Sequence, residues 1–357
     1  MGCLDLKSMV EFSSTVNILF FSRLFYPHIG GVEKHVLEIS RLLIKKGHKV
    51  IVVTEQSSSK TKLNEIVEGI EIFRIPSLQD GKIKKFQIWK WLFGNLQLIK
   101  NADVIHCQDV FFWYLPFRFL FPFKKVFTTF HGYEGYPLKV KDILIHKISE
   151  KLSNGNICIG SFIKKWYGTK PNYVSYGGVE IPNSKLQVSS ETKRNSAVFI
   201  GRLDEQTGIL TYVKAVKAIR KKIPNFDFLI IGGGYLKSKI GRGMKISDPL
   251  TDASDYFLNY NFAFVSGYLS MMEAMAARRL VFAVYEDPLK EDYLKMAPFS
   301  KYIVIFNSSS ELVFKISYYL DNSKKKEELI EKAYRWVKKR TWKEMISIYL
   351  KLWGVNS

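Results

Sequence analysis

Three segments place glycine, serine or arginine where an anionic ligand could bind. Gly30-Gly31 come directly before an apolar run with helical spacing, and such glycines let a phosphate approach the N–H groups of a helix N-terminus. Residues 266–270 (SGYLS) lead in the same way into a run that contains Glu273. Arg202 ends another apolar run, and a guanidinium can bind two oxygens of a diphosphate at once. These residue types indicate a ligand that carries phosphate groups.

Two histidines stand where predicted strands end. His131 lies in TTFHGYEG, where the glycine that follows lets the loop turn toward a ligand, so we expect its ring to bind a polar substrate. His106 lies in ADVIHCQD, and there a buried histidine whose ring nitrogens are bound by the protein is the favoured alternative to a ligand contact.

Apolar runs of strand length alternate with helical periodicity through the first half of the chain. Strands are expected at 16–22, 48–55, 69–76, 102–109, 124–132, 155–161 and 171–178, and helices at 32–47, 86–101 and 140–154. A strand–helix–strand unit requires parallel strands, so this half predicts one doubly wound, Rossmann-like domain.

The alternation restarts after a polar stretch rich in serine, asparagine and threonine. Strands are expected at 196–202, 226–231, 262–265 and 280–284, and helices at 209–223, 271–277, 310–321, 324–339 and 342–353. We therefore expect an N-terminal extension (1–15), a first α/β domain (16–183), a linker (184–196), a second α/β domain (197–340) and a last helix (341–357) that packs back across both. Ligands bind at the carboxyl ends of parallel strands, so two such domains facing each other would share one cleft.

The chain carries 54 basic and 33 acidic side chains, a net charge of +21 that is spread over both halves. Nucleic acid, an anionic membrane surface, anionic small molecules or a merely solvated surface would each fit such a surplus. We expect no nucleic-acid partner, because no helix-turn-helix, zinc-finger or RNP-like motif is present. The three cysteines lack metal-ligand spacing and predict free thiols in a reducing compartment, hence a cytoplasmic protein. No signal peptide is expected, because the first 14 residues contain no long apolar run. No spanning segment is expected, because prolines and an arginine interrupt the most apolar run, 110–123.

Taken together, these segments resemble the retaining glycosyltransferases of family 4, a large group with the GT-B fold. The matching segments follow the family's order over nearly the whole chain. They are RLFYPHIGGVEKHVLEISRLLIKKGHKVIVVT, ADVIHCQD, TTFHGYEG, FIGRLDEQTGI, FLIIGGG, SGYLSMMEAMAARRLVFA and the closing RTWKEMISIYLKLW. The resemblance implies a GT-B fold, with two Rossmann-like domains facing each other across a cleft.

The resemblance also implies a role for each matching residue. Arg202 matches the arginine on the donor phosphates, His131 the active-site histidine near the transferred sugar, and Glu273 the second glutamate of a Glu-x7-Glu motif, which holds the nucleotide ribose. The remaining donor-binding residues would be Gly30, Gly31, Thr207, Ser266, Gly267, Tyr268 and Leu269. On the acceptor side we expect Arg23 and His106.

Two positions depart from the family. Val265 stands eight residues before Glu273, where the family has its first glutamate, and Thr207 stands where a phosphate-binding lysine is usual. A lost charge-assisted hydrogen bond costs about 1.5–3 kcal/mol, so we expect weaker or rerouted activity unless other groups compensate. Nearby lysine or arginine side chains, such as Arg278 or Arg279, are the expected substitutes.

The resemblance implies transfer of a sugar, with retention, from a nucleotide-diphosphate sugar to a glycan or lipid-linked acceptor. No cofactor is expected, and no metal, since no DxD-like pair of acidic residues is found. The charge, with the aromatic and basic segments 86–100 and 110–125, makes an anionic membrane surface a candidate partner. The main alternative is a non-catalytic GT-B protein that binds a nucleotide sugar or a partner glycosyltransferase. A different GT-B enzyme, such as an epimerase or a phosphorylase, is a further alternative.

Overall fold

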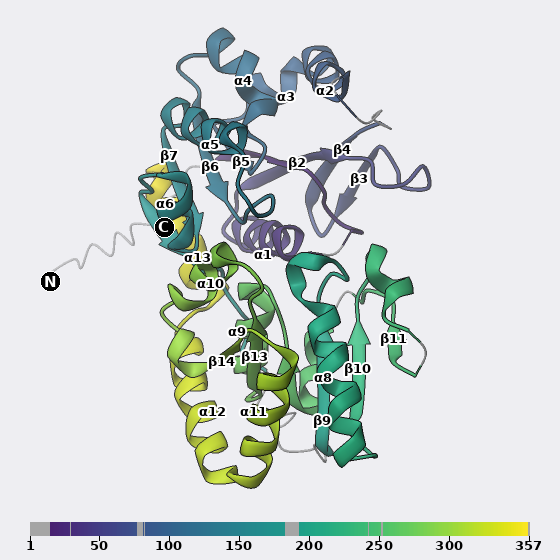
Figure 1. Cartoon of the computed structure of the whole chain (residues 1–357). Helices are drawn as coiled ribbons and strands as arrows, with labels where there is room; N and C mark the ends of the chain where they lie inside the picture. Colours follow the sequence, from purple (N-terminus) through teal and green to yellow (C-terminus); the bar gives the residue numbers. More distant parts are fainter. Residues whose placement is uncertain are drawn as a thin grey trace, which may run out of the picture.

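The computed structural model describes residues 15–28, 30–76, 81, 83–182, 193–241, 243–250 and 253–355. These residues form two α/β units, each built on one parallel or mainly parallel sheet (Figure 1). The expected fold class is therefore confirmed. Residues 1–14 of the expected extension and 184–192 of the expected linker lie outside the described residues.

The first unit has an eight-stranded sheet in the order β3-β4-β2-β1-β5-β6-β7-β8. Its strands are β1 (Asn17–Ser22), β2 (Lys49–Glu55), β3 (Asn64–Val67), β4 (Ile70–Ile75), β5 (Val104–Gln108), β6 (Lys125–Phe130), β7 (Gly155–Ile159) and β8 (Tyr173–Ser175). Neighbouring strands pair in parallel, except that β3 and β4 form an antiparallel hairpin.

Helices cover both faces of this sheet. They are α1 (Gly31–Lys45), α2 (Ile83–Gly94), α3 (Leu96–Asn101), α4 (Phe111–Leu120), α5 (Val140–Leu152) and α6 (Phe162–Tyr167). Leu19 and Phe21 of β1 point into a core shared with α2 and α4, whereas Ile18 and Phe20 point into a core shared with α1. Burial on both faces explains why β1 is an unbroken apolar run.

The second unit has a six-stranded parallel sheet in the order β11-β10-β9-β12-β13-β14. Its strands are β9 (Lys193–Ile200), β10 (Asp227–Ile231), β11 (Lys245–Ser247), β12 (Tyr260–Phe264), β13 (Leu280–Val284) and β14 (Val304–Phe306). Its α-helices are α8 (Ile209–Lys222), α9 (Tyr268–Ala276), α10 (Pro288–Lys295), α11 (Ser309–Asp321) and α12 (Ser323–Val337). Short 3-10 turns lie at η1 (Glu205–Thr207), η2 (Tyr235–Lys239), η3 (Ala253–Asn259) and η4 (Ser300–Tyr302).

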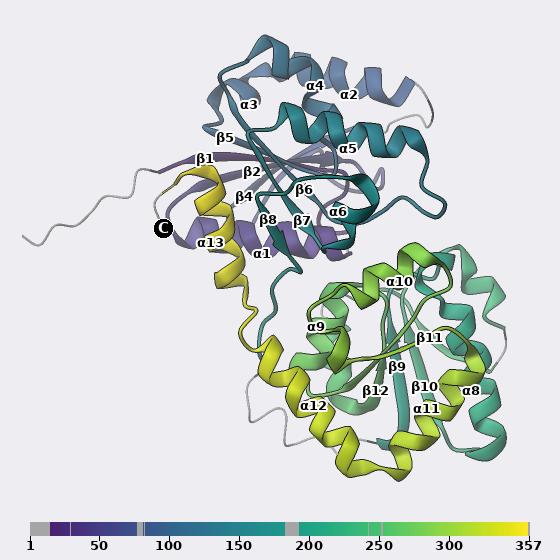
Figure 2. The same cartoon turned by 60° about the vertical axis from the view of Figure 1, so that its left-hand side comes forward.

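The last helix, α13 (Trp342–Trp353), leaves the second unit and packs against α1 of the first (Figure 2). The crossing point is tight, because Val179 pairs with Thr341 and its N–H donates to the Arg340 carbonyl. A Cβ at Gly178 would lie 2.7 Å from the Trp342 nitrogen, so only glycine fits there. The chain thus ends on the unit where it began.

The sequence analysis did not predict β3, β11, β14, α4, α6 or α10. The helix expected at 86–101 is divided, because α2 ends at Gly94 and α3 begins at Leu96. Cys107 and Cys158 are free, buried thiols, as expected. None of the described helices combines the length and apolarity needed to cross a bilayer.

Candidate functional site

The predicted donor-binding residues follow β1, β9 and β12, which flank the reversal of strand order in each sheet, and His131 follows β6, the neighbour of β5. This reversal lies between β1 and β5 in the first unit and between β9 and β12 in the second, which is where open α/β sheets bind ligands. Contacts join the two halves: Gln206 Nε2 donates to the Glu134 carbonyl (3.0 Å), and the Tyr133 ring lies edge-on to Tyr293 at 6.1 Å between centroids. The loop after His131 therefore lies against loops of the second unit.

His131 is half-buried at the end of β6 and is held from both sides. Its Nε2 donates to Gln108 Oε1 (2.7 Å), and its backbone N–H donates to Asp109 Oδ1 (2.9 Å). Because Oε1 can only accept, the proton of a neutral ring resides on Nε2 and leaves Nδ1 as an acceptor. Desolvation holds the His131 pKa well below its ordinary value of 6.5, so the ring is neutral at pH 7. It can accept a hydrogen bond from a hydroxyl.

Asp109 reaches the same loop from the end of β5. Its backbone has a φ of 60°, a left-handed conformation that aspartate tolerates. The residue is exposed to solvent, yet desolvation by the protein atoms near its carboxylate raises its pKa to about 6. The sequence analysis did not single out Asp109.

His106 does not face a ligand. It is fully buried, its Nδ1 accepts from Trp353 Nε1 (3.0 Å), and its Nε2 bonds to Thr129 Oγ1 (2.8 Å). The acceptor-side role expected for His106 is therefore wrong, and the alternative of a satisfied structural histidine holds. Arg23 is exposed, with its Nε 4.0 Å from a Glu55 oxygen.

A buried polar network beneath His131 begins on the C-terminal helix. The Tyr349 hydroxyl of α13 lies 2.9 Å from His35 Nε2, 3.0 Å from Thr129 Oγ1 and 3.5 Å from Gln108 Nε2. Burial lowers the pKa of His35 to about 3, so this histidine is also neutral. The sequence gives no local signal for this network, since its members lie far apart along the chain.

Arg202 stands exposed in the loop after β9. Its Nε lies 3.2 Å from Asp204 Oδ2, and an Nη donates to Gln206 Oε1 (3.0 Å). Thr207 turns inward instead, with its hydroxyl bonded to the carbonyls of Arg202 (2.9 Å) and Asp204 (2.8 Å). The Arg202 side chain is therefore open to a ligand, whereas the Thr207 side chain shapes the loop that carries it.

The N-terminus of α9 holds the other predicted donor-binding residues. Gly267 is the N-cap. Tyr268 is buried, and its ring stacks on that of Tyr293 with 3.9 Å between the ring centroids and an angle of 5° between the ring planes. The Tyr268 N–H donates to the Tyr293 hydroxyl (2.8 Å), so Tyr293 occupies one of the N–H groups expected to face phosphate. Leu269 follows, half-buried against the core. The Ser266 hydroxyl bonds to the Gln206 carbonyl (3.3 Å), which ties this loop to that of Arg202.

Glu273 links the two units directly. One of its carboxylate oxygens lies 2.6 Å from Lys34 Nζ, and the two side chains are 14% and 27% exposed. Lys34 lies in the first turns of α1, just after Gly30 and Gly31. A Cβ added to Gly31 would meet no described atom within 4 Å, so a ligand could approach this backbone closely.

Val265 departs from the family, and Arg278 and Arg279 were expected to compensate for the lost charge. Val265 is fully buried and presents no polar side chain. Arg278 pairs with Glu331 and Arg279 donates to the Phe257 and Leu258 carbonyls, at the far end of α9. Their expected role as substitute cations is wrong, because a helix separates them from the loop of Arg202.

The residue best placed to substitute is Lys290, which the sequence analysis missed. It is buried, and its Nζ donates to both the carbonyl and the hydroxyl of Ser266 (2.8 and 2.9 Å). One signal was available: a lysine in the first turn of a helix opposes the helix dipole, and the preceding Asp287-Pro288 marks such a helix start.

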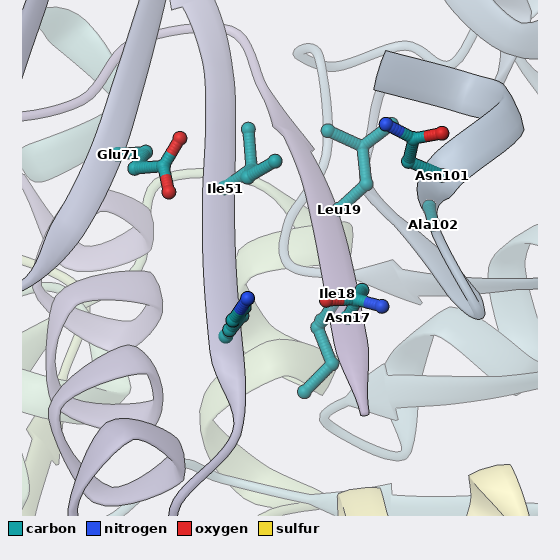
Figure 3. A pocket seen from close by; sticks show the side chains of 8 residues that line it. Asn17, Ile18, Leu19, Ile51, Glu71, Asn101 and Ala102 are labelled. Carbon is teal, nitrogen blue, oxygen red and sulfur yellow. The ribbon is translucent and has the colours of Figure 1, made fainter. Parts of the chain in front are cut away.

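Within the described parts of the chain, no three His, Cys, Asp or Glu side chains gather as metal ligands would. A surface pocket of about 440 Å³ lies near the amino ends of β1 and β2, lined by Asn17, Lys49 and Glu71 among others (Figure 3). The pocket lies at the amino ends of the strands, whereas His131 and the other predicted site residues lie at the carboxyl ends. We place the candidate site at the carboxyl ends, where those residues are.

Comparison with known proteins agrees with this arrangement. Residues 29–173 match the model of Glycosyltransferase Family 4. One component of the human phosphatidylinositol N-acetylglucosaminyltransferase is 28% identical over 37% of this chain and 23% of its own length. Phosphatidyl-myo-inositol mannosyltransferase of Mycobacterium tuberculosis is 24% identical over 71% of this chain and 74% of its own. The chain thus spans about a quarter of the human relative.

Solved structures show the same fold at low identity. Sucrose-phosphate synthase from Thermosynechococcus elongatus superposes with a TM-score of 0.74, at 15% identity, over 96% of this chain and 100% of its own. An alpha-glucosyltransferase in complex with UDP superposes with a TM-score of 0.56, at 15% identity, over 94% of this chain and 99% of its own. The predicted resemblance to family 4 and the predicted GT-B fold are both confirmed.

Proposed function

We propose that this chain, whose residues 29–173 match the model of Glycosyltransferase Family 4 and whose fold is GT-B, transfers a sugar from a nucleotide-diphosphate sugar to an acceptor hydroxyl. The observation that carries the proposal is the convergence of Arg202, the α9 N-terminus and Glu273 opposite His131, joined across the units by the Lys34–Glu273 pair. These groups suit the phosphates, the ribose and the sugar of one ligand.

In the proposed reaction the bond between the sugar C1 and the diphosphate oxygen breaks, and a bond from C1 to the acceptor oxygen forms on the same face. The acceptor proton passes to the departing diphosphate. Arg202 and the positive end of α9 stabilise the negative charge that develops there. His131, neutral and with Nδ1 free to accept, orients the sugar through one of its hydroxyls. The proposal needs neither a metal nor a cofactor.

The acceptor that we propose is lipid-linked and lies at an anionic membrane surface. Both relatives described above carry phosphatidylinositol or phosphatidyl-myo-inositol in their names. Large apolar side chains stand out from α2, α4 and the loop after α4: Phe86 (65% exposed), Phe119 (70%) and Phe123 (98%). Lysines and one arginine accompany them, namely Lys84, Lys85, Lys90, Lys100, Arg118, Lys124 and Lys125. Inserted aromatic rings among basic groups suit the cytoplasmic leaflet, which carries anionic lipid.

The proposal is tested by incubating the protein with UDP-, GDP-, ADP- or TDP-sugars and a lipid extract. Release of nucleoside diphosphate together with a glycosylated lipid supports it, and the coupling constant of the anomeric proton in the product reports retention or inversion. A Glu273→Gln variant should lose most of the activity. Full activity in that variant would contradict the assignment of the ribose site.

A non-catalytic GT-B protein is the second candidate, and three observations favour it. Val265 is buried and apolar, Thr207 is folded into its own loop, and Tyr293 occupies the Tyr268 N–H. Such a protein would bind a nucleotide sugar without releasing its diphosphate. Turnover therefore separates the two candidates.

A further inference from the structure

Lys290 is an unusual lysine. Only 5% of its surface is exposed, and it lies in the first turn of α10, where the helix dipole disfavours a cation. A buried ammonium is costly unless it is paired. Yet among the described residues no carboxylate lies within ion-pairing distance of its Nζ, which bonds only to the two Ser266 oxygens and faces the Tyr293 ring at 4.1 Å.

Hydrogen bonds connect this buried ammonium to the loop of Arg202. Ser266 bonds to the Gln206 carbonyl, and the Gln206 side chain accepts from Arg202. Lys290 and Arg202 are thus connected by two residues, one in each of the loops expected to hold the donor diphosphate. An ammonium has three N–H donors, and Ser266 takes two. The third faces the Tyr293 ring and meets no described oxygen, so it can donate to an anion that enters this loop.

We propose that Lys290 supplies the second positive charge on the donor's diphosphate, in place of the cation that Thr207 does not provide. The inference rests on the proposed function and names the group that recognises the diphosphate. Arg202 binds from the exposed side of the loop, and Lys290 binds from beneath it. The two cations together match the two negative charges of the diphosphate in a nucleotide sugar.

The environment of Lys290 makes this binding sensitive to pH. Desolvation, with a smaller contribution from Arg202, lowers its pKa to about 7, while Asp287 and Asp204 oppose the shift. The side chain is therefore charged below about pH 7 and neutral above it in the empty protein. Donor binding should weaken by up to about tenfold per pH unit above 7, because each bound donor must then recruit a proton to Lys290.

The test measures the dissociation constant of a nucleotide sugar between about pH 6 and pH 9 by calorimetry. A nucleotide sugar is used because the terminal phosphate of a free nucleoside diphosphate itself titrates near about pH 6. The variants are Lys290→Met, Lys290→Gln and Arg202→Met. Lys326→Met is the control, since Lys326 is a half-buried lysine of the same unit, bonded to Asn261 at 3.0 Å and remote from this loop.

The proposal expects Lys290→Met and Lys290→Gln to weaken binding about 10- to 100-fold at pH 6 and to abolish the pH dependence. Lys326→Met should behave as the wild type. Wild-type affinity in Lys290→Gln would show that Lys290 only pins Ser266 through neutral hydrogen bonds, and would overturn the inference. Weakened binding in Arg202→Met with unchanged binding in Lys290→Met would overturn it too, while leaving the proposed function standing. Failure of the wild type to bind any nucleotide sugar would overturn both.

A second readout does not require a ligand. A lysine whose pKa is depressed in the folded protein binds fewer protons there than in the unfolded chain between about pH 7 and 10. The wild type should therefore gain stability relative to Lys290→Met as pH rises through that window. A constant difference would show that Lys290 keeps its proton throughout and would contradict the expected pH dependence of donor binding.

Discussion

Lys34 on α1 and Glu273 on α9 form an ion pair of 2.6 Å that joins the two α/β units of the chain. Each residue lies within the first two turns of a helix that begins at the carboxyl edge of its sheet. The pair therefore connects the units at the candidate site itself. A donor whose ribose binds Glu273 must share this carboxylate with Lys34.

Replacing Lys34 by methionine should lower the free energy of unfolding by about 1–3 kcal/mol, because a mostly buried carboxylate loses a charge-assisted bond. Urea denaturation measures this change. Lys315→Met is the matched control: Lys315 is 30% exposed and pairs with Glu311 at 3.3 Å within one helix, so its loss should cost less than about 0.5 kcal/mol. Equal effects of the two substitutions would argue against the interdomain bond.

The hydroxyl of Tyr349 offers a second stability test. Tyr349→Phe removes a buried hydroxyl that serves His35, Thr129 and Gln108, so it should cost about 1–3 kcal/mol. Tyr114 supplies the control, since its hydroxyl is buried and no described residue bonds to it. Tyr114→Phe should leave stability unchanged or raise it. A larger loss of unfolding free energy in Tyr114→Phe than in Tyr349→Phe, measured by urea denaturation, would contradict the network.

Gln108 should act on transfer rather than on nucleotide binding. Gln108→Leu removes the acceptor of His131 Nε2, so the ring loses its fixed orientation and kcat/KM should fall about 100-fold. Affinity for the nucleoside diphosphate alone should not change, because His131 faces the sugar. Gln97→Leu, an exposed substitution on α3, is the control. A parallel loss of nucleotide affinity in Gln108→Leu would mean that the substitution disturbs more than the histidine.

Much of this arrangement could be predicted from the sequence, and the reason is physical. Parallel strands buried on both faces, such as β1 and β10, are nearly continuous apolar runs, and glycines mark the turns that follow them. Residues at strand ends, such as His131 and Arg202, are therefore found by position alone. The three-residue strand β14 and the eight-residue helix α10 are too short for either periodicity to be distinctive.

Contacts between distant segments could not be predicted. Nothing near His131 in the sequence indicates that Gln108 and, through it, Tyr349 of the last helix would support its ring. Nothing near Arg202 indicates that a lysine in the first turn of α10 would bond to Ser266. His106 stands near a strand end in the sequence, as His131 does, but Trp353 and Thr129 bond to both nitrogens of its ring. The contact with Trp353 depends on where α13 packs.

The aromatic side chains of the first unit give a membrane prediction. In a vesicle sedimentation assay with anionic lipid at low salt, the double variant Phe119→Ser/Phe123→Ser should bind at least about tenfold more weakly, since each inserted ring contributes about 1.5–3 kcal/mol. Phe314→Ser, equally exposed (69%) but on α11 of the second unit, should bind as the wild type does. Binding should also weaken as salt screens the lysines. Wild-type binding by the double variant would exclude this surface.

The most direct test of the donor site is a thermal-shift panel of UDP-, GDP-, ADP- and TDP-sugars on the wild type, Arg202→Met and Arg335→Met. The two arginines are matched, because each is 70% exposed and each lies near one carboxylate, at 3.2 Å and 3.0 Å. We predict that one nucleotide sugar stabilises the wild type and Arg335→Met, with slow release of its nucleoside diphosphate, and stabilises Arg202→Met far less. Equal stabilisation of all three proteins, or of none by any donor, would contradict the proposed site.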